Sequence, residues 1–232
     1  MKKKVPPAPS DPELNPNGPM DFRRAGSWRI FRIMAEFIDG FQFLGDLKRE
    51  VTFFGSARAK TGDFFYKEAQ KLGTMLGKAG FTVITGGGPG IMEAGNRGAA
   101  EAKAPSVGLN IQLPSEQRVN QYVSSSMAFH YFFVRKVMLS VSAQAYIFFP
   151  GGFGTIDELC ELIMLIQTKK MVRIPIVLVG NKFWSGLFGW IKDTVLEKHN
   201  YIAAEDLGIV TIVDSADEAF EIVKHSNERQ YP

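Results

Sequence analysis

The glycine-rich stretch 150–158, Pro-Gly-Gly-Phe-Gly-Thr-Ile-Asp-Glu, holds residue types that could do chemistry. An apolar run at 145–149 precedes it and a helical pattern at 158–166 follows it, so we expect a strand, a tight turn and a helix start. Glycines leave backbone N–H groups uncovered, and a helix N-terminus attracts anions such as phosphate. Glu158 lies about one helical turn further on, where its carboxylate could reach a reacting group. The stretch predicts an enzyme acting on a phosphorylated small molecule.

A second glycine-rich turn, Gly-Gly-Gly-Pro-Gly, occupies 86–90. It lies between a β-rich run at 81–85 and a helical composition at 91–102, and Pro89 suits a first helical position. Two such strand-to-helix turns in one chain favour nucleotide binding at the carboxyl edge of a sheet. The alternative is that these glycines only allow helices to pack closely on the sheet.

Apolar runs alternate with helical patterns along most of the 232 residues. We expect strands at 51–54, 81–85, 106–111, 145–149, 174–179 and 209–213, and a further short strand within 121–127. Helices are expected at 64–78, 90–103, 130–141, after Thr155, at 183–198 and at 215–226. This order predicts an α/β fold with a doubly wound, Rossmann-like, mostly parallel sheet flanked by helices.

Three regions follow from the composition. Residues 1–25 form a proline-rich tail, 26–48 an N-terminal helix and 49–228 a single domain. The predicted helix carries an apolar stripe that would pack on the domain or on a second subunit, consisting of Ile30, Ile33, Met34, Phe37, Phe41 and Leu44. Gly40 is expected to interrupt it.

Composition excludes several classes of function. A net charge of +3, part of it from residues 2–4, does not imply a broad nucleic-acid-binding face. The single cysteine, Cys160, excludes an internal disulfide and is expected to be buried, and the three histidines lack metal-ligand spacing. No apolar run approaches the roughly 20 residues of a membrane span, so we expect a cytoplasmic protein. We expect it to bind no metal and no cofactor. The first strand ends at 55–58, Gly-Ser-Ala-Arg, which argues against a dinucleotide-binding motif.

On these residues the chain resembles the LOG ("Lonely Guy") family, nucleoside 5′-monophosphate phosphoribohydrolases that release cytokinin bases. The resemblance covers about 50–225 and rests on Gly-Gly-Gly-x-Gly-Ile-Met at 86–92, the Arg-Lys pair at 135–136, and P-G-G-x-G-T-x-x-E at 150–158. Many members carry a lysine decarboxylase-like label. Nothing in this sequence marks a pyridoxal-phosphate lysine.

The resemblance implies specific roles. Arg135 and Glu158 would be the catalytic pair, and Gly152, Gly154 and Thr155 would hold the 5′-phosphate. The substrate-binding positions would be Ser56, Gly87, Gly88, Gly90, Met92, Glu116, Lys136, Gly151, Gly152, Phe153, Gly154, Thr155 and Asp157. Cleavage of a ribosyl C–N bond builds positive charge on the sugar, which a carboxylate can stabilise while it orients or deprotonates water. An arginine rarely gives up a proton, so Arg135 is assigned to positioning and electrostatics.

The implied reaction is hydrolysis of AMP or cytokinin riboside 5′-monophosphates to free base and ribose 5-phosphate. At 165–173 the chain departs from plant-type members, which leaves the preferred base open. The alternative is a non-catalytic nucleotide or molybdenum-cofactor carrier on the same fold. A DNA-processing function lacks support because no basic-aromatic stripe is present. Family members are homodimers or larger, so we expect a homo-oligomer with no nucleic-acid or membrane partner.

Overall fold

The computed structural model describes residues 26–112 and 119–228. Its core is one sheet of seven strands in the order β4-β3-β2-β1-β5-β6-β7, with every neighbouring pair parallel. The strands are β1 (Glu50–Phe54), β2 (Thr82–Thr85), β3 (Ser106–Ile111), β4 (Ser125–Phe129), β5 (Ala145–Phe148), β6 (Ile176–Val179) and β7 (Val210–Val213). The predicted α/β, doubly wound sheet is confirmed.

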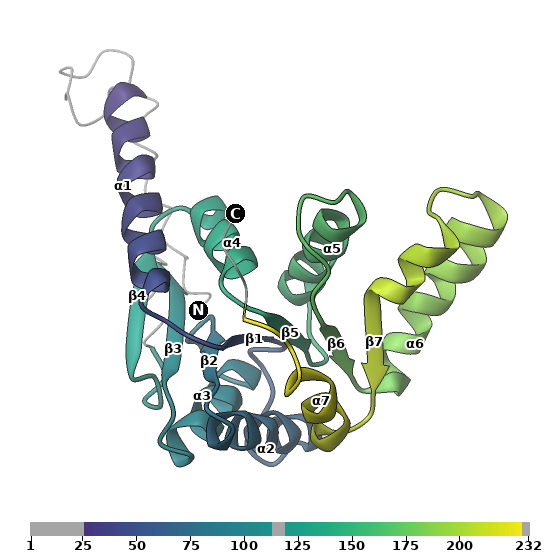
Figure 1. Cartoon of the computed structure of the whole chain (residues 1–232), viewed down its shortest axis with the longest axis horizontal. Coiled ribbons are helices and arrows are strands. Elements are labelled where there is room, and N and C mark those ends of the chain that lie inside the picture. The colour runs from purple at the N-terminus through teal and green to yellow at the C-terminus, as the bar shows by residue number, and fades with distance from the viewer. Residues whose placement is uncertain (1–25, 113–118, 229–232) are drawn as a thin grey trace, which may run out of the picture.

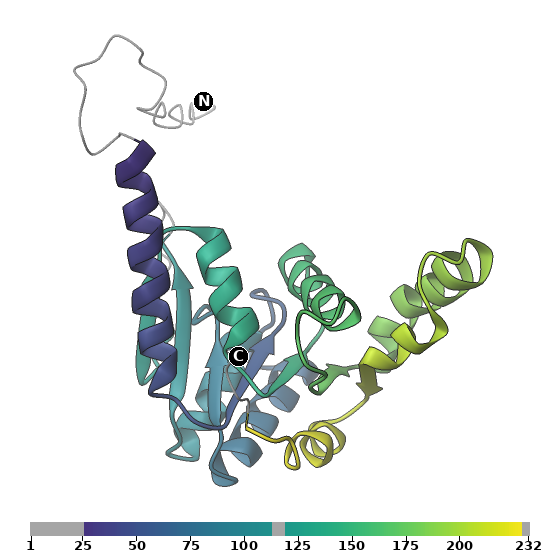
Figure 2. The same ribbon diagram turned by 45° about the horizontal axis from the view of Figure 1, so that its top comes forward.

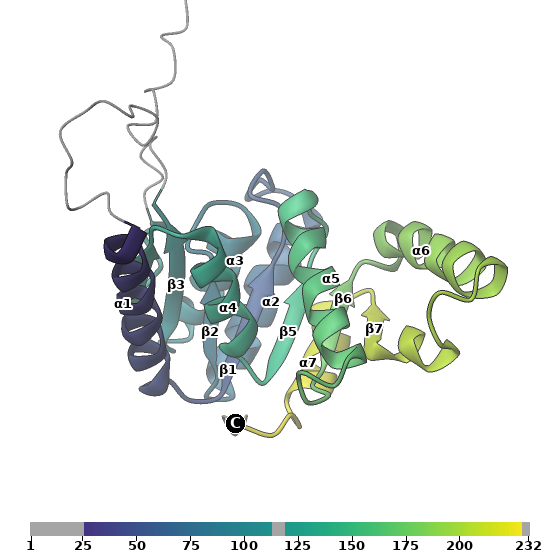
Figure 3. The ribbon, with the colours of Figure 1, turned by 90° about the horizontal axis from the view of Figure 1, so that it is seen from above.

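Helices cover both faces of the sheet (Figure 1). They are α1 (Gly26–Gly45), α2 (Phe64–Lys78), α3 (Ile91–Glu101), α4 (Phe132–Val141), α5 (Phe153–Gln167), α6 (Asn181–Trp190) and α7 (Ala216–Val223). One face carries α1, α4, α5 and α6, which stand in a row when seen from above, and the other carries α2, α3 and α7 (Figure 3). The predicted helix at 183–198 divides into α6 and a π-helical segment, Ile191–Lys198, and a 3-10 segment, Ala204–Ile209, precedes β7.

Each face of the sheet has its own apolar core. Along β5, Tyr146 and Phe148 join the core under α4, α5 and α6, while Ala145 and Ile147 join the core under α2, α3 and α7. This alternation is what a strand buried on both faces requires. The two cores fix the strands in register, so that all seven carboxyl ends meet at one edge, where the connecting loops gather.

The N-terminal helix differs from its prediction at Gly40. Helix α1 continues through this residue without a break. A Cβ at position 40 would lie 2.6 Å from the Met138 Sδ, so the glycine allows α1 to pack closely on α4. Figure 2 shows α1 running beside β4 and α4. The apolar stripe is divided: Ile33, Phe37 and Leu44 pack against the core, whereas others face outward. Exposed apolar side chains of α1 are Ile30, Phe31, Met34, Ile38 and Phe41.

Three local predictions were wrong. The short strand lies at 125–129, further along than the predicted 121–127, since residues 121–124 turn into it. Helix α3 begins at Ile91 with Gly90 as its N-cap, so Pro89 precedes the helix. Cys160 is exposed rather than buried, because its position on α5 faces the groove toward α4.

Within the two described ranges, no helix combines the length and apolarity that crossing a bilayer requires.

Candidate active site

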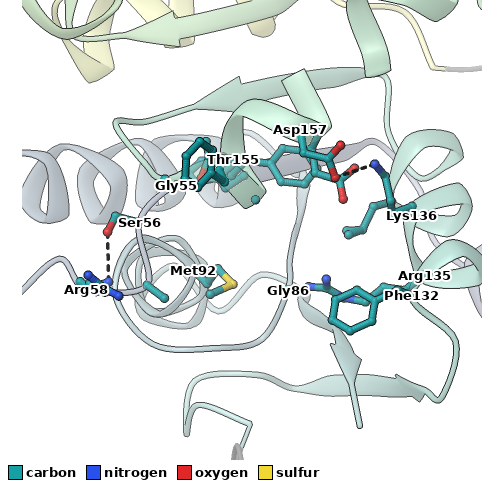
Figure 4. Close-up of a pocket in the computed structure, with 18 residues that line it drawn as sticks. Gly55, Ser56, Arg58, Gly86, Met92, Phe132, Arg135, Lys136, Thr155 and Asp157 are labelled. Atoms are coloured by element: carbon teal, nitrogen blue, oxygen red, sulfur yellow. Dashed lines mark hydrogen bonds and ion pairs between the residues drawn. The ribbon is translucent and has the colours of Figure 1, made fainter. Parts of the chain in front are cut away.

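A cavity of about 690 Å³ opens at the carboxyl edge of the sheet, beside β1 and β5. The chain winds from β1 to β2 on one side and continues from β5 to β7 on the other, so this is the point where strand order switches. Ligands of open α/β sheets bind at such a crevice. The wall consists of Phe53, Phe54, Gly55, Ser56, Ala57, Arg58, Gly86, Met92, Phe132, Arg135, Lys136, Leu139, Gly152, Phe153, Gly154, Thr155, Asp157 and Glu158 (Figure 4).

The turn after β5 presents a helix N-terminus to the cavity. Gly152 is the N-cap of α5, no side chain caps this end, and the Thr155 N–H donates to the Gly152 carbonyl at 3.0 Å. The first N–H groups of a helix have no partner within the helix, so those at Phe153 and Gly154 can bind an anion. A Cβ at Gly151 would lie 2.6 Å from the Thr155 Cβ, so this glycine makes room for the threonine. The arrangement suits a phosphate group.

The loop after β1 is held between the two glycine-rich turns. The Ser56 N–H donates to the Pro150 carbonyl at 3.0 Å, and the Ser56 carbonyl accepts from the Ile91 N–H at 3.0 Å. Gly90 has φ +72°, and a Cβ there would lie 2.9 Å from the Ala57 Cα. Only a glycine allows this backbone conformation and approach without strain. The loop is therefore fixed against both turns, and Ser56 lies on the cavity wall.

The turn at 86–90 is held in place by hydrogen bonds to Asn120. The Gly87 carbonyl accepts from the Asn120 N–H at 2.9 Å and from its side-chain amide at 3.1 Å, and that amide also donates to the Gly88 carbonyl at 3.0 Å. Gly86 lies on the cavity wall, but Gly87, Gly88 and Gly90 do not. Gly86 therefore borders the cavity directly, and a substrate-binding role for Gly87, Gly88 and Gly90 stays a prediction.

Glu158 lies in the second turn of α5 and is 7% exposed although it borders the cavity. Burial raises the pKa of its carboxyl to about 7, because removal from water disfavours the charged form. Lys136 and Arg135 lower this pKa through their charges, and Glu161 and Asp157 raise it. Near neutral pH the group is therefore present in both protonation states, as suits an acid-base residue.

Arg135 belongs to α4 and lines the cavity from that helix. Its Nε donates to the Leu109 carbonyl at 2.7 Å, which anchors the guanidinium against β3. A Cβ at Gly86 would collide with the Arg135 Nη2, so the glycine leaves the space that this group occupies. Burial lowers the pKa of Arg135 and the Glu158 carboxylate raises it, but an arginine remains a cation at physiological pH. It supplies a fixed positive charge.

Lys136 joins α4 to α5. Its Nζ lies 2.7 Å from the Asp157 Oδ2 and 2.9 Å from the Glu161 Oε2. Burial alone lowers the pKa of the ammonium, but the hydrogen bonds to Asp157 and Glu161 outweigh it and the pKa lies above its usual value. Lys136 therefore stays protonated and orients the Asp157 carboxylate at the cavity wall.

The structure brings most of the sequence-predicted site residues to one cavity. On its wall lie Ser56, Met92, Arg135, Lys136, Gly152, Phe153, Gly154, Thr155, Asp157 and Glu158. Gly151 does not line the cavity but lies against Thr155, which does, and Glu116 falls outside the described residues.

Among the exposed side chains of the wall that the sequence did not predict, the two large ones are Arg58 and Phe132. Both had a signal. Arg58 closely follows a strand whose carboxyl end faces the site. Phe132 lies three residues before Arg135, on the same face of a helix. In the residues that the structure describes, no three histidine, cysteine or acidic side chains cluster as metal ligands.

A family model described as "possible lysine decarboxylase" matches residues 92–223, more than half of the chain. A curated protein of Escherichia coli, pyrimidine/purine nucleotide 5′-monophosphate nucleosidase, is 28% identical over 193 residues, which is 79% of this chain. The match spans only 42% of the length of that relative.

Solved structures show the same fold. The molybdenum cofactor carrier protein of Chlamydomonas reinhardtii aligns with a TM-score of 0.58 and 20% identity, covering 77% of this chain and 98% of that one. The molybdenum cofactor binding protein of Rippkaea orientalis aligns with a TM-score of 0.56 and 21% identity, covering 75% and 93%. At this identity the similarity concerns the fold alone, so the function has to be argued from the site.

Proposed function

The chain belongs to the LOG-type family whose model is described as "possible lysine decarboxylase", and on this premise we propose that it is a nucleoside 5′-monophosphate phosphoribohydrolase. The proposed substrates are AMP or cytokinin riboside 5′-monophosphates. The products are the free base and ribose 5-phosphate. The nucleosidase name of the Escherichia coli relative supports this class of reaction.

One observation carries the proposal: a buried carboxyl with a pKa of about 7 lies one helical turn from an uncapped helix N-terminus. When the substrate phosphate binds at Gly152–Thr155, the ribose extends into the cavity toward Glu158. The C1′–N bond to the base weakens as positive charge develops on the sugar, and the Glu158 carboxylate stabilises that charge. A water oxygen then bonds to C1′ while its proton passes to Glu158.

The departing base keeps the electron pair of the broken bond and takes a proton from solvent. Arg135 contributes a fixed charge and a planar donor fork, which can bind oxygens of the ribose or phosphate. Lys136 holds Asp157 and, through its charge, favours the ionised form of Glu158. These groups come from α4 and α5, which lie side by side on the same face of the sheet (Figure 3).

The description as a lysine decarboxylase implies pyridoxal phosphate, and the cavity residues do not fit that cofactor. A lysine that forms a Schiff base must be a neutral amine with a lowered pKa. Lys136, which lines the cavity, is instead paired with two carboxylates and has a raised pKa.

We further propose a cytoplasmic homodimer or larger homo-oligomer. The exposed apolar side chains of α1 support association, because a monomer in water rarely leaves such a row uncovered. Ile30, Phe31 and Ile38 are each about 60% exposed.

A substrate panel tests the proposed reaction. Purified protein is incubated with AMP, GMP, CMP, UMP and isopentenyladenosine monophosphate, and released bases are resolved by chromatography. Glu158→Gln removes the charge at constant size, and Glu197→Gln is the matched control on an exposed surface. We expect base and ribose 5-phosphate from the unmutated protein and the control but not from Glu158→Gln. Tight binding without any hydrolysis would instead favour a nucleotide or cofactor carrier.

A further inference from the structure

The cavity wall carries three cations, and they differ in how they are neutralised. Lys136 is paired with Asp157 and Glu161, whereas Arg135 donates to the Leu109 carbonyl and is influenced by the charge of Glu158. Among the ion pairs of residues 26–112 and 119–228, none involves Arg58. Arg58 is exposed and borders the same cavity. Its charge is therefore available to a bound anion.

The backbone at Arg58 is held in place even though its side chain is exposed. Its N–H donates to the Ser56 Oγ at 3.1 Å. The backbone of Ser56 is in turn hydrogen-bonded to the Pro150 carbonyl and to the Ile91 N–H. The bond to Pro150 joins this loop to the turn that leads into α5. Figure 4 shows Ser56 and Arg58 at one end of the cavity and Arg135 with Lys136 at the other. Arg58 thus reaches the cavity from the β1 side of the strand-order switch, opposite α5.

We propose that Arg58 is the residue that selects phosphorylated substrates, by binding the 5′-phosphate across the cavity from the α5 N-terminus. This rests on the proposed function and deepens it. The uncapped N–H groups at Phe153 and Gly154 bind one side of the phosphate, and the guanidinium binds the other. An arginine suits this position because its fork of N–H donors matches two phosphate oxygens. Arg58 is a positioning and specificity residue and takes no part in bond cleavage.

The charge of the phosphate gives a reason for a separate cation. A phosphate monoester carries between one and two negative charges near neutral pH, and the helix N-terminus offers only about half a positive charge. Lys136 is engaged by two carboxylates, and Arg135 lies at the far end of the cavity wall. Arg58 supplies the missing charge without bringing a further cation close to Glu158, whose pKa would fall if one were added.

Ligand binding tests the inference independently of turnover. Dissociation constants for AMP, ribose 5-phosphate and adenosine are measured by calorimetry with the unmutated protein, Arg58→Ala and Arg58→Lys. Lys60→Ala is the matched control, because Lys60 is an exposed cation of the same loop that does not border the cavity. Circular dichroism and thermal unfolding establish that each variant is folded.

We expect Arg58→Ala to weaken AMP and ribose 5-phosphate binding about tenfold or more, the usual effect of losing a charge-assisted hydrogen bond. Adenosine binding should change less than twofold, and Arg58→Lys should bind phosphorylated ligands with intermediate affinity. In steady-state assays KM for AMP rises in Arg58→Ala while kcat stays within about threefold. The difference in AMP affinity between Arg58→Ala and the unmutated protein should become smaller as salt is added, because salt screens the charge of the exposed Arg58 side chain.

Two results overturn the inference: an AMP dissociation constant that changes less than threefold in Arg58→Ala, or an equal loss of adenosine and AMP binding. Failure of the proposed function has a different signature. Phosphate-dependent binding that requires Arg58, without hydrolysis of any monophosphate, would refute the hydrolase and leave the role of Arg58 standing. Absence of AMP binding by the unmutated protein would refute both.

Discussion

Replacement of Glu158 by glutamine should stabilise the protein while removing its proposed activity. The folded-state pKa of Glu158 is about 7, against 4.5 for an ordinary glutamate, so folding costs free energy whenever the carboxyl is ionised. A pKa raised in the folded state means that this cost is fully present above pH 7 and disappears as the pH falls toward 4.5. At about 1.4 kcal/mol per pKa unit, the cost above pH 7 is about 3 kcal/mol.

Chemical and thermal unfolding at two pH values measures this effect. At pH 8.5 we expect the free energy of unfolding of Glu158→Gln to be about 3 kcal/mol larger than that of the unmutated protein. This corresponds to a Tm that is roughly 6–12 °C higher. At pH 5 the gain should fall below about 1 kcal/mol, because the buried carboxyl is then protonated in the folded protein. Glu197→Gln, on an exposed surface, should change little at either pH. An equal gain at both pH values, or a loss at pH 8.5, would refute the assignment of a buried, ionising carboxyl.

The remaining predictions concern catalysis and assembly. The kcat/KM for AMP should fall about tenfold per pH unit below pH 7, because the active form of Glu158 is the carboxylate. Lys136→Met should shift this fall in kcat/KM to higher pH, because the charge of Lys136 lowers the pKa of Glu158. A pH–rate profile that Lys136→Met leaves unmoved would contradict the coupling. Phe132→Ala should raise KM for AMP about tenfold or more through lost stacking with the base, while ribose 5-phosphate binding measured by calorimetry stays constant. Ile38→Glu should lower the mass measured by light scattering, whereas a monomeric unmutated protein would contradict association through α1.

The sequence predicted the sheet and the glycine-rich start of α5 because both depend on local patterns. Alternating apolar runs define strands buried on both faces, and the glycines at 150–154 mark the start of α5. Most predicted helix and strand bounds lie within a few residues of the observed ones for the same reason. The shift of β4 reflects a turn anchored by Asn120, whose bonds to Gly87 and Gly88 cross between distant segments.

The electrostatic character of the site could not be predicted, because it depends on contacts between elements. The pKa of Glu158 is set mainly by burial and by the charge of Lys136 on α4, which sequence spacing alone does not bring close to α5. The role of Gly40 also depends on a contact between elements. A glycine at this position predicted a break in the helix, but the helix is unbroken and the glycine makes room for Met138 of α4. The difference between Arg58 and Lys136 depends on the ion pairs that Lys136 makes with Asp157 and Glu161, which only the structure shows.

If water attacks C1′ of a nucleoside 5′-monophosphate, as proposed, an oxygen atom from the solvent enters the ribose 5-phosphate, and isotope labelling measures this. The protein is incubated with AMP in oxygen-18 water, and the products are analysed by mass spectrometry after short reaction times. We predict adenine together with ribose 5-phosphate that carries one oxygen-18 atom, which appears with Glu197→Gln but not with Glu158→Gln. Adenosine with labelled inorganic phosphate, or no cleavage of either AMP or isopentenyladenosine monophosphate under the same conditions, would contradict cleavage of the N-glycosidic bond at this site.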